Sequence, residues 1–343
     1  MKSMNFMKNK KSASSLITYG MVIAAYIIVQ ILVSTGNISS LMKGLLVPLC
    51  VYAILAVSLN LTVGILGELS LGHAGFMCIG AFSGAFFSKC MQQVITVGWL
   101  RITLAIVIGS LVAGLFGFLI GMPVLRLKGD YLAIVTLGFG EIVKTVVNVL
   151  YVGRDENGFH FSMKSNAALN MTENGKTIIK GAQGITGTPK DANFTIGIIL
   201  LLVTLFIVLN LVNSRDGRAI MAIRDNRIAA ESVGINITKY KLMAFSISAA
   251  LAGSAGVLYA HNLNTLTANT NNFGYNMSIN ILVFVVLGGI GNIRGSIFGA
   301  VILTLLPELL RRFDLDNLRM LIYAVVLIAV MLFTNRQKKG GNK

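Results

Sequence analysis

Apolar runs long enough to cross a membrane recur along the whole chain, and they constrain its fold more than any other feature. A helix of about 20 apolar residues crosses the hydrocarbon core of a bilayer, which is about 30 Å thick. Such runs cover residues 16–33, 44–66, 73–87, 101–124, 131–151, 194–212, 242–260 and 318–334. Charged residues make up only 12% of the chain, against about 25% in a typical soluble domain. We therefore expect one all-α, polytopic transmembrane helix bundle over residues 1–343.

A further apolar stretch, 278–310, is too long for one span and too short for two full ones. The glycine-rich segment Gly288–Gly295 divides it. Spans of about 20 residues then predict a bundle of about 8–10 segments, with some helices broken at glycine. The pattern leaves open whether this stretch forms a re-entrant pair or two tilted spans.

The cations lie mainly at the ends of the apolar runs, as the positive-inside rule describes. Lysines at positions 2, 8, 10 and 11 precede the first run, and Arg336, Lys338, Lys339 and Lys343 follow the last. Counting the divided stretch as two passes places both termini in the cytoplasm of a multi-pass protein of the plasma (inner) membrane. The positive-inside rule therefore accounts for the net charge of +16, and we expect no nucleic acid as a partner.

The same topology predicts a polar outer loop at 152–193 and a cytoplasmic loop at 214–241. The outer loop carries five cations and four anions, which suits a translocated loop under little charge constraint. Its middle, 157–180, is a polar insertion that is either partly flexible or a small docking surface. The composition favours flexibility.

The glycine-rich segment between the second and third apolar runs is a candidate for a solute pathway. Ionisable residues at membrane depth are functional candidates, and helix-breaking glycines free backbone groups that can face a polar solute. The residues assigned to the pathway here are Gly67, Glu68, Ser70, Gly72 and His73. The competing interpretation is that Ser70 or His73 only caps the helix that follows.

A weak internal repeat extends this assignment, because residues 63–69 resemble residues 287–293 and each segment precedes a helix rich in small residues. Glycine-interrupted segments at matching places in two halves point to the central site of a transporter. The further pathway candidates are Gly288, Gly291, Asn292 and Gly295. The match is short, so chance similarity is the alternative.

Glu141 and Lys144 are three positions apart and can pair on one helix face. Glu141 is included among the pathway candidates, although a buried pair of this kind favours a role in helix packing. The three cysteines lack metal-ligand spacing and the three histidines lie in distant segments. No metal site is therefore expected.

The loop 214–241 is distinctive because apolar residues recur in it at helical spacing among cations. This spacing predicts an amphipathic helix over residues 218–233. Its expected apolar contacts are Ile220, Met221, Ile223, Ile228, Ala229 and Val233. Gly234 is suited to end the helix in a left-handed turn.

A protein that only conducts has little need of such a helix, whereas one driven from the cytoplasm needs a docking element. We therefore predict that a cytoplasmic partner supplies the energy and contacts this loop. The predicted coupling residues are Arg218, Arg224, Asn226, Ala229, Ala230, Glu231 and Gly234.

Catalysis finds no support in the sequence, which has no GxSxG, HExxH or paired-carboxylate arrangement. The nearest approach to a phosphate-binding loop is Gly175-Lys176-Thr177, and Asn170 stands where that motif needs glycine. We expect a protein that is not an enzyme, binds no cofactor and hydrolyses no ATP itself.

Five segments resemble the LivM-type permeases of branched-chain amino acid ABC importers. They are LSLGHAGF (69–76), LRLKGDYLAIVTLGFGEIVK (125–144), GITGTP (184–189), GRAIMAIRDNRIAAESVGINITKYKLMAFSISAALAGSAGVLYAH (217–261) and VVLGGIGNIRGSIFGA (285–300). The resemblance extends from about Leu45 to Phe333. It implies a heterodimer with a LivH-like permease subunit, two cytoplasmic ATPase subunits that use ATP, and an extracytoplasmic substrate-binding protein.

The resemblance also implies that the segment Ala229-Ala230-Glu231-x-x-Gly234 docks into the ATPases, with Glu231 and Arg224 as the leading contacts. The chain departs from the family pattern in two places. A later Leu-Pro element, found in many importers, is absent, and the insertion at 157–180 is longer than is usual in the family.

Two other functions fit parts of the pattern. The first is a related importer permease for urea or short amides, which is similar over the same motifs. The second is an ion-coupled secondary carrier that works alone. The cytoplasmic docking loop argues against the second.

Overall fold

The computed structural model describes residues 2–36, 39–127, 129–156, 158–172 and 175–312, and residues 325 and 328. Of the predicted last span, 318–334, only Val325 and Ile328 are described, and both are helical. The rest of that span and the basic C-terminal tail lie outside the described residues.

Within this part of the chain, seven helices are long and apolar enough to cross a membrane. They are α1 (Lys2–Ser34), α2 (Ser40–Asn60), α3 (His73–Met91), α4 (Gly98–Val124), α5 (Asp130–Val149), α6 (Phe194–Asn213) and α9 (Ile237–Ala260). The divided stretch forms two helices, α11 (Tyr275–Gly288) and α12 (Ile293–Arg312). Both the all-α bundle and the division at the glycine-rich break are confirmed, and the chain is a multi-pass membrane protein.

Small residues bring α3, α4 and α9 into close contact. A Cβ atom added to Gly253 in α9 would lie 2.9 Å from the carbonyl oxygen of Gly109 in α4. One added to Gly256 would lie 2.9 Å from the carbonyl carbon of Met77 in α3. Small residues that let backbones approach are a main source of helix association in lipid. The opposite face of α4 exposes large apolar side chains such as Leu111 and Leu115, which suits contact with lipid.

Gly253→Val is expected to destabilise the bundle by about 1–3 kcal/mol, because the added side chain would force α4 and α9 apart. The measurement is the thermal unfolding midpoint of the purified protein in detergent. Gly44→Ala is the matched control, since a Cβ atom there meets nothing within 4 Å. An unchanged midpoint for Gly253→Val would contradict the close packing.

Two glycine breaks interrupt the bundle. After α2 the chain forms a π-helix, η1 (Leu61–Leu66). This helix ends before Gly67, which has a φ of 80°. After α11 it passes through Gly289 and Gly291, with φ values of 91° and 85°. Only glycine adopts such angles at little cost, so both helices end where their glycines stand.

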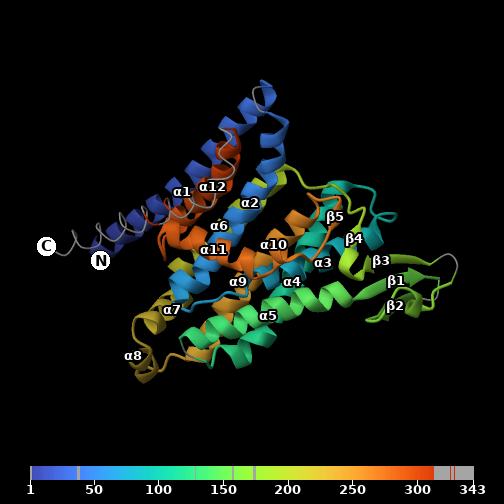
Figure 1. Ribbon diagram of the computed structural model, residues 1–343. Helices are drawn as coiled ribbons and strands as arrows, with labels where there is room; N and C mark the ends of the chain where they lie inside the picture. Colours follow the sequence, from blue (N-terminus) through green and yellow to red (C-terminus); the bar gives the residue numbers. More distant parts are fainter. Residues whose placement is uncertain are drawn as a thin grey trace.

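The outer loop folds into a small antiparallel sheet. Strands β1 (Tyr151–Asp155), β2 (Gly158–Ser162) and β3 (Lys176–Lys180) take the order β2-β1-β3. Figure 1 shows this sheet continuing from the end of α5. The strands β4 (Ile185–Thr186) and β5 (Thr265–Leu266) form a second pair.

This sheet differs from the flexible insertion that the composition favoured at 157–180. Strand pairing explains the difference, because Val152 of β1 lies opposite Ile179 of β3 and both side chains are buried. Short 3₁₀ helices, η2 (Ala167–Leu169) and η3 (Gly181–Gln183), connect the strands.

The loop 214–241, which the sequence predicts to be cytoplasmic, forms two short helices rather than the single helix predicted over 218–233. The first, α7 (Arg215–Asp225), ends before Asn226, whose backbone is extended, and α8 (Arg227–Ser232) follows. The Asn226 Oδ1 atom accepts a hydrogen bond from the Ala229 N–H at 3.0 Å. Asparagine favours this capping position because its side chain satisfies a free helix N–H. Gly234 has a φ of 83° and forms the left-handed turn that its position predicted.

Figure 1 places α7 and α8 at one end of the molecule and the sheet β2-β1-β3 at the other. A one-turn helix, α10 (Thr270–Phe273), lies between β5 and α11. The cytoplasmic and outer elements that the sequence separated are therefore also separated in space.

Candidate functional site

The first break, residues 67–72, lies between η1 and the start of α3. Ser70 is 1% exposed, and its Oγ atom has no hydrogen-bond partner within the described part of the chain. Glu68 forms an ion pair with Lys241 near the start of α9, and both side chains are largely buried. This pair ties the break to the helix that follows the cytoplasmic loop.

His73 is buried at the first position of α3. Its Nε2 atom lies 2.7 Å from the Ser58 Oγ atom of α2. The residue that precedes α3 is Gly72, and no side chain of residues 70–73 caps the helix. The alternative that Ser70 or His73 serves as a cap is therefore wrong.

A side chain from the second half of the protein caps α3 instead. The Ala74 N–H donates to the Ser278 Oγ atom of α11 at 3.1 Å. The Leu71 N–H likewise donates to the Thr136 Oγ1 atom of α5 at 3.0 Å. Buried hydroxyl groups on neighbouring helices thus satisfy backbone groups freed by the break, as a low-dielectric interior requires.

The two glycine breaks meet at Asn60, which is fully buried at the end of α2. Its Oδ1 atom accepts from the Gly291 N–H at 2.9 Å, and its Nδ2 atom donates to the Ser296 Oγ atom at 2.9 Å. A Cβ atom added to Gly64 would lie 2.7 Å from the Gly291 Cα atom. The segments that form the weak internal repeat are therefore in direct contact.

The predicted pathway residues are not all buried. Asn60, Ser70 and His73 are at most 2% exposed, whereas Gly67 and Asn292 are exposed. The contact between the two segments therefore lies beside residues that reach the surface.

Sequence reasoning missed several of these residues. Ser58, Asn60, Ser278 and Ser296 all lie inside apolar runs and were assigned to spans. The feature that could have identified them is a polar side chain within an apolar run. Burying such a side chain in a membrane helix is costly unless it is hydrogen-bonded. Asn60 and Ser58 stand close before Gly64, so polarity next to a glycine break could have identified them.

Glu141 and Lys144 form the predicted ion pair on α5. The Glu141 Oε1 atom also accepts from the Tyr275 N–H at 2.7 Å, and the Lys144 Nζ atom donates to the Thr270 Oγ1 atom at 3.1 Å. A carboxylate at the first residue of α11 is favourable because the N-terminus of a helix is partly positive. The pair therefore joins α5 to the start of α11.

A second polar cluster lies at the outer end of the bundle. Arg101 binds Asp191 through its Nε and Nη2 atoms, each at 2.8 Å. Near it, His261 Nε2 lies 2.7 Å from Ser88 Oγ, and Nδ1 lies 2.9 Å from the Val257 carbonyl oxygen. Burial lowers the pKa of His261, and Nδ1 must be the donor to the Val257 oxygen because a carbonyl group only accepts. These contacts hold outer segments together.

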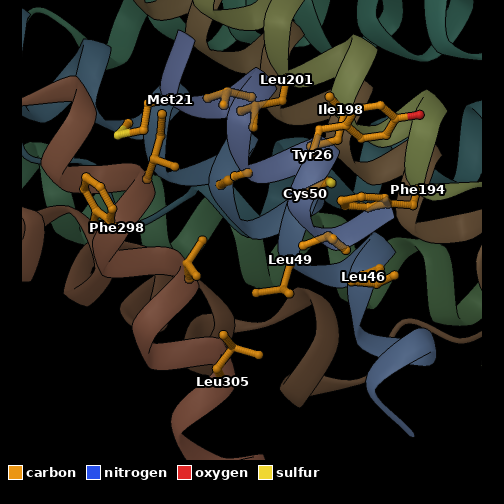
Figure 2. Close-up of a pocket in the computed structure, with 16 residues that line it drawn as sticks. Met21, Tyr26, Leu46, Leu49, Cys50, Phe194, Ile198, Leu201, Phe298 and Leu305 are labelled. Atoms are coloured by element: carbon orange, nitrogen blue, oxygen red, sulfur yellow. The ribbon is translucent and has the colours of Figure 1, made fainter. Parts of the chain in front are cut away.

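An apolar groove lies between α1, α2, α6 and α12, and Figure 2 shows the side chains that line it. Among the aromatic residues that line the groove, Tyr26 carries a polar group. Its ring centroid lies 5.6 Å from that of Phe194, and its hydroxyl group shares a hydrogen bond of 3.2 Å with the Thr195 Oγ1 atom. A zwitterionic solute needs polar partners, which this groove lacks. It is therefore a different place from the breaks and suits apolar contacts within the bilayer.

Only part of the predicted apolar face of the loop 214–241 packs against the protein. Ile220 and Ile223 of α7 are buried, as expected. Ile228 and Val233 are 81% and 75% exposed, and Ala229 is exposed as well, so the prediction that these three residues pack against the protein is wrong. The new helix that begins after Asn226 turns them outward and instead buries Ala230, a predicted coupling residue.

The other predicted coupling residues are at the surface. Those exposed are Arg218, Arg224, Asn226, Ala229, Glu231 and Gly234. Arg224 also reaches inward, because its Nη1 atom donates to the Gly64 carbonyl oxygen at 2.9 Å. The loop 214–241 is thus bonded directly to η1, the helix that precedes the first glycine break.

Glycine-broken helices that contact each other in a multi-pass bundle are typical of a membrane transporter subunit. Residues 41–331 match the family described as "Branched-chain amino acid transport system / permease component". The chain belongs to this family.

The chain is also similar to individual permease proteins of two bacteria. The chain is 36% identical over 289 residues to the high-affinity branched-chain amino acid transport system permease protein LivM of Salmonella typhimurium LT2, and 35% identical to LivM of Escherichia coli K12. Both matches cover 82% of this chain and 66% of the relative, slightly less than two thirds of its length. The related permease protein LivH of Escherichia coli K12 is 25% identical over 286 residues, which cover 82% of this chain and 88% of LivH. No solved structure matches the chain.

Proposed function

We propose that this chain is a permease subunit of an ABC importer for branched-chain amino acids. It works as a heterodimer with a LivH-like subunit, and two cytoplasmic ATPase subunits use ATP to drive it. An extracytoplasmic binding protein delivers the solute. The observation that supports this most directly is the bond from the cytoplasmic loop, at Arg224, to η1, the helix that precedes a glycine break in the membrane bundle.

The proposed orientation follows the cations. The protein lies in the inner membrane with both termini and the loop 214–241 in the cytoplasm, and the sheet β2-β1-β3 outside. The sheet is a candidate contact for the binding protein, because it is held to the bundle rather than free. The Phe86 ring of α3 lies 5.7 Å from the Phe159 ring of β2, and the Arg154 Nη1 atom of β1 donates to the Cys90 carbonyl oxygen of α3 at 3.5 Å.

The proposed pathway runs between the two glycine breaks. The residues that would line it on opening are Gly67, Glu68, Ser70, Gly72, His73, Gly288, Gly291, Asn292 and Gly295, with Glu141 beside them. The Ser70 hydroxyl is buried without a described partner, and the start of α3 is close by. Helix N-termini attract carboxylates, so an α-amino acid is a suitable solute.

The test of this function is uptake of labelled leucine in a strain that lacks the chain, with and without the intact gene. ATP-dependent uptake that is lost and then restored supports the proposal. Unchanged leucine uptake together with lost uptake of urea or short amides favours that related importer class. Uptake driven by a proton gradient without an ATPase partner would instead identify a secondary carrier.

Glu231→Ala is expected to lower ATP-dependent uptake about tenfold, the usual scale for losing one good interface contact. Glu231 is exposed on α8, so the substitution should leave the bundle folded. Uptake and the thermal unfolding midpoint are measured on the same preparation. Normal uptake would contradict the assignment of Glu231 to the docking surface.

A further inference from the structure

Arg224 stands at the end of α7 and binds the end of η1. Its Nη1 atom donates to the Gly64 carbonyl oxygen at 2.9 Å. Gly64 lies in the last turn of a helix that ends at Leu66, where carbonyl groups lack helical partners. A cation at this end of a helix is favourable. The contact is therefore more than a chance approach of a long side chain.

The stem of Arg224 packs where the first break turns. Gly67 has a φ of 80°, and a Cβ atom added to it would lie 2.5 Å from the Arg224 Cγ atom. Gly67 thus meets two requirements at once, a left-handed backbone and space for Arg224. Any displacement of the Arg224 side chain acts directly on the residue at which η1 ends.

The two other guanidinium nitrogens of Arg224 also form hydrogen bonds, both within α7. Its Nε and Nη2 atoms donate to the Asp225 Oδ1 atom at 3.0 and 2.9 Å. All three guanidinium nitrogens therefore have partners inside the protein. This arrangement suits a residue that is held in place by its own chain better than one that awaits an external partner.

Gly64 also carries the contact onward to the second break. It packs against Gly291, and Asn60 bonds to the Gly291 N–H at 2.9 Å and to the Ser296 Oγ atom. An uninterrupted series of contacts thus leads from α7 through η1 to the start of α12. Because the parts are tightly packed, the series can transmit a displacement.

We propose that Arg224 transmits the movement of α7 to both glycine breaks, as a positioning residue and not as a docking contact of the ATPases. The inference rests on the proposed function and names the residue through which coupling passes. In this proposal the ATPases dock on the exposed surface of α8. Arg224 then converts the displacement that docking causes into separation of the breaks.

The experiment uses the whole transporter, reconstituted in proteoliposomes with its ATPase subunits and binding protein. Arg224→Met removes the guanidinium group but keeps a stem that can pack against Gly67. Arg224→Lys keeps a cation that can reach towards the Gly64 carbonyl oxygen. Arg215→Ala is the matched control, because Arg215 is an exposed arginine at the other end of α7. Co-purification of the ATPases, ATP hydrolysis and leucine uptake are measured for each variant.

Arg224→Met is expected to retain the ATPases and to hydrolyse ATP within about twofold of the parent, while uptake per ATP falls about tenfold, as loss of a charged hydrogen bond implies. Arg224→Lys should recover part of the uptake, and Arg215→Ala should match the parent. Loss of ATPase co-purification in Arg224→Met, or an equal fall in hydrolysis and uptake, would overturn the proposal in favour of a docking role. Normal uptake per ATP would also overturn it. If the unsubstituted protein itself binds no ATPase, that result rejects the proposed function and not only the role of Arg224.

Discussion

Ile228→Asp is expected to remove most ATP-driven uptake while the membrane bundle stays folded. Ile228 is 81% exposed on α8, on a loop outside the membrane spans, where a large apolar side chain has no lipid to face. Apolar anchors of this kind dominate protein interfaces, and losing one costs about 2 kcal/mol or more. A charge in its place should weaken binding of the ATPases about 30-fold or more.

The measurement is the affinity of the purified permease for its ATPase subunits, together with uptake in proteoliposomes. Thr238→Asp is the matched control, because it adds the same charge at an exposed position near the start of α9. The control should keep uptake close to that of the parent. Unchanged ATPase affinity in Ile228→Asp would show that α8 docks through other residues.

Gly64→Ala is the second substitution with a large expected effect. The new methyl group would lie 2.7 Å from the Gly291 Cα atom and would also press on the Asn60 side chain. Backbone cannot move aside as a flexible side chain can, so the cost should exceed the 1–3 kcal/mol or so that is usual for overpacking. The two breaks would be forced apart, and uptake should be largely lost.

Gly138→Ala provides the comparison for this result. Gly138 lies within α5, and a Cβ atom there meets nothing within 4 Å. Alanine should be tolerated or stabilise the helix by up to about 1 kcal/mol. Thermal unfolding and uptake are measured for both variants. Parent-like stability and uptake in Gly64→Ala would refute the direct contact between the breaks.

The membrane helices could be predicted from the sequence because their cause is local. An apolar run in lipid must satisfy its own backbone groups, and a helix does so within the run. The predicted runs therefore correspond to α1 to α6 and α9, and the glycines at 288–291 separate α11 from α12. Pairing of Glu141 with Lys144 could be predicted for the same reason, since both stand on one helix face.

The sequence-based predictions that were wrong failed because helix capping and contacts between segments overrode the local sequence pattern. Helical spacing continued through residues 218–233, but Asn226 capped a new helix and turned Ile228 and Val233 outward. Polar composition favoured flexibility at 157–180, whereas pairing with β1 made strands of both ends of that segment. Ser278 lies far from Ala74 in sequence, so its role as the cap of α3 could not be read from either segment.

By itself, the sequence determined that this protein is an all-α membrane bundle with glycine-broken helices and a distinctive cytoplasmic loop. Those properties follow from hydropathy, helical spacing and backbone freedom, which each segment carries alone. Only the tertiary structure decided that the two breaks touch at Asn60 and that Arg224 joins the loop to one of them. Contacts between residues more than 100 positions apart depend on how helices pack, and packing is decided by the whole chain at once.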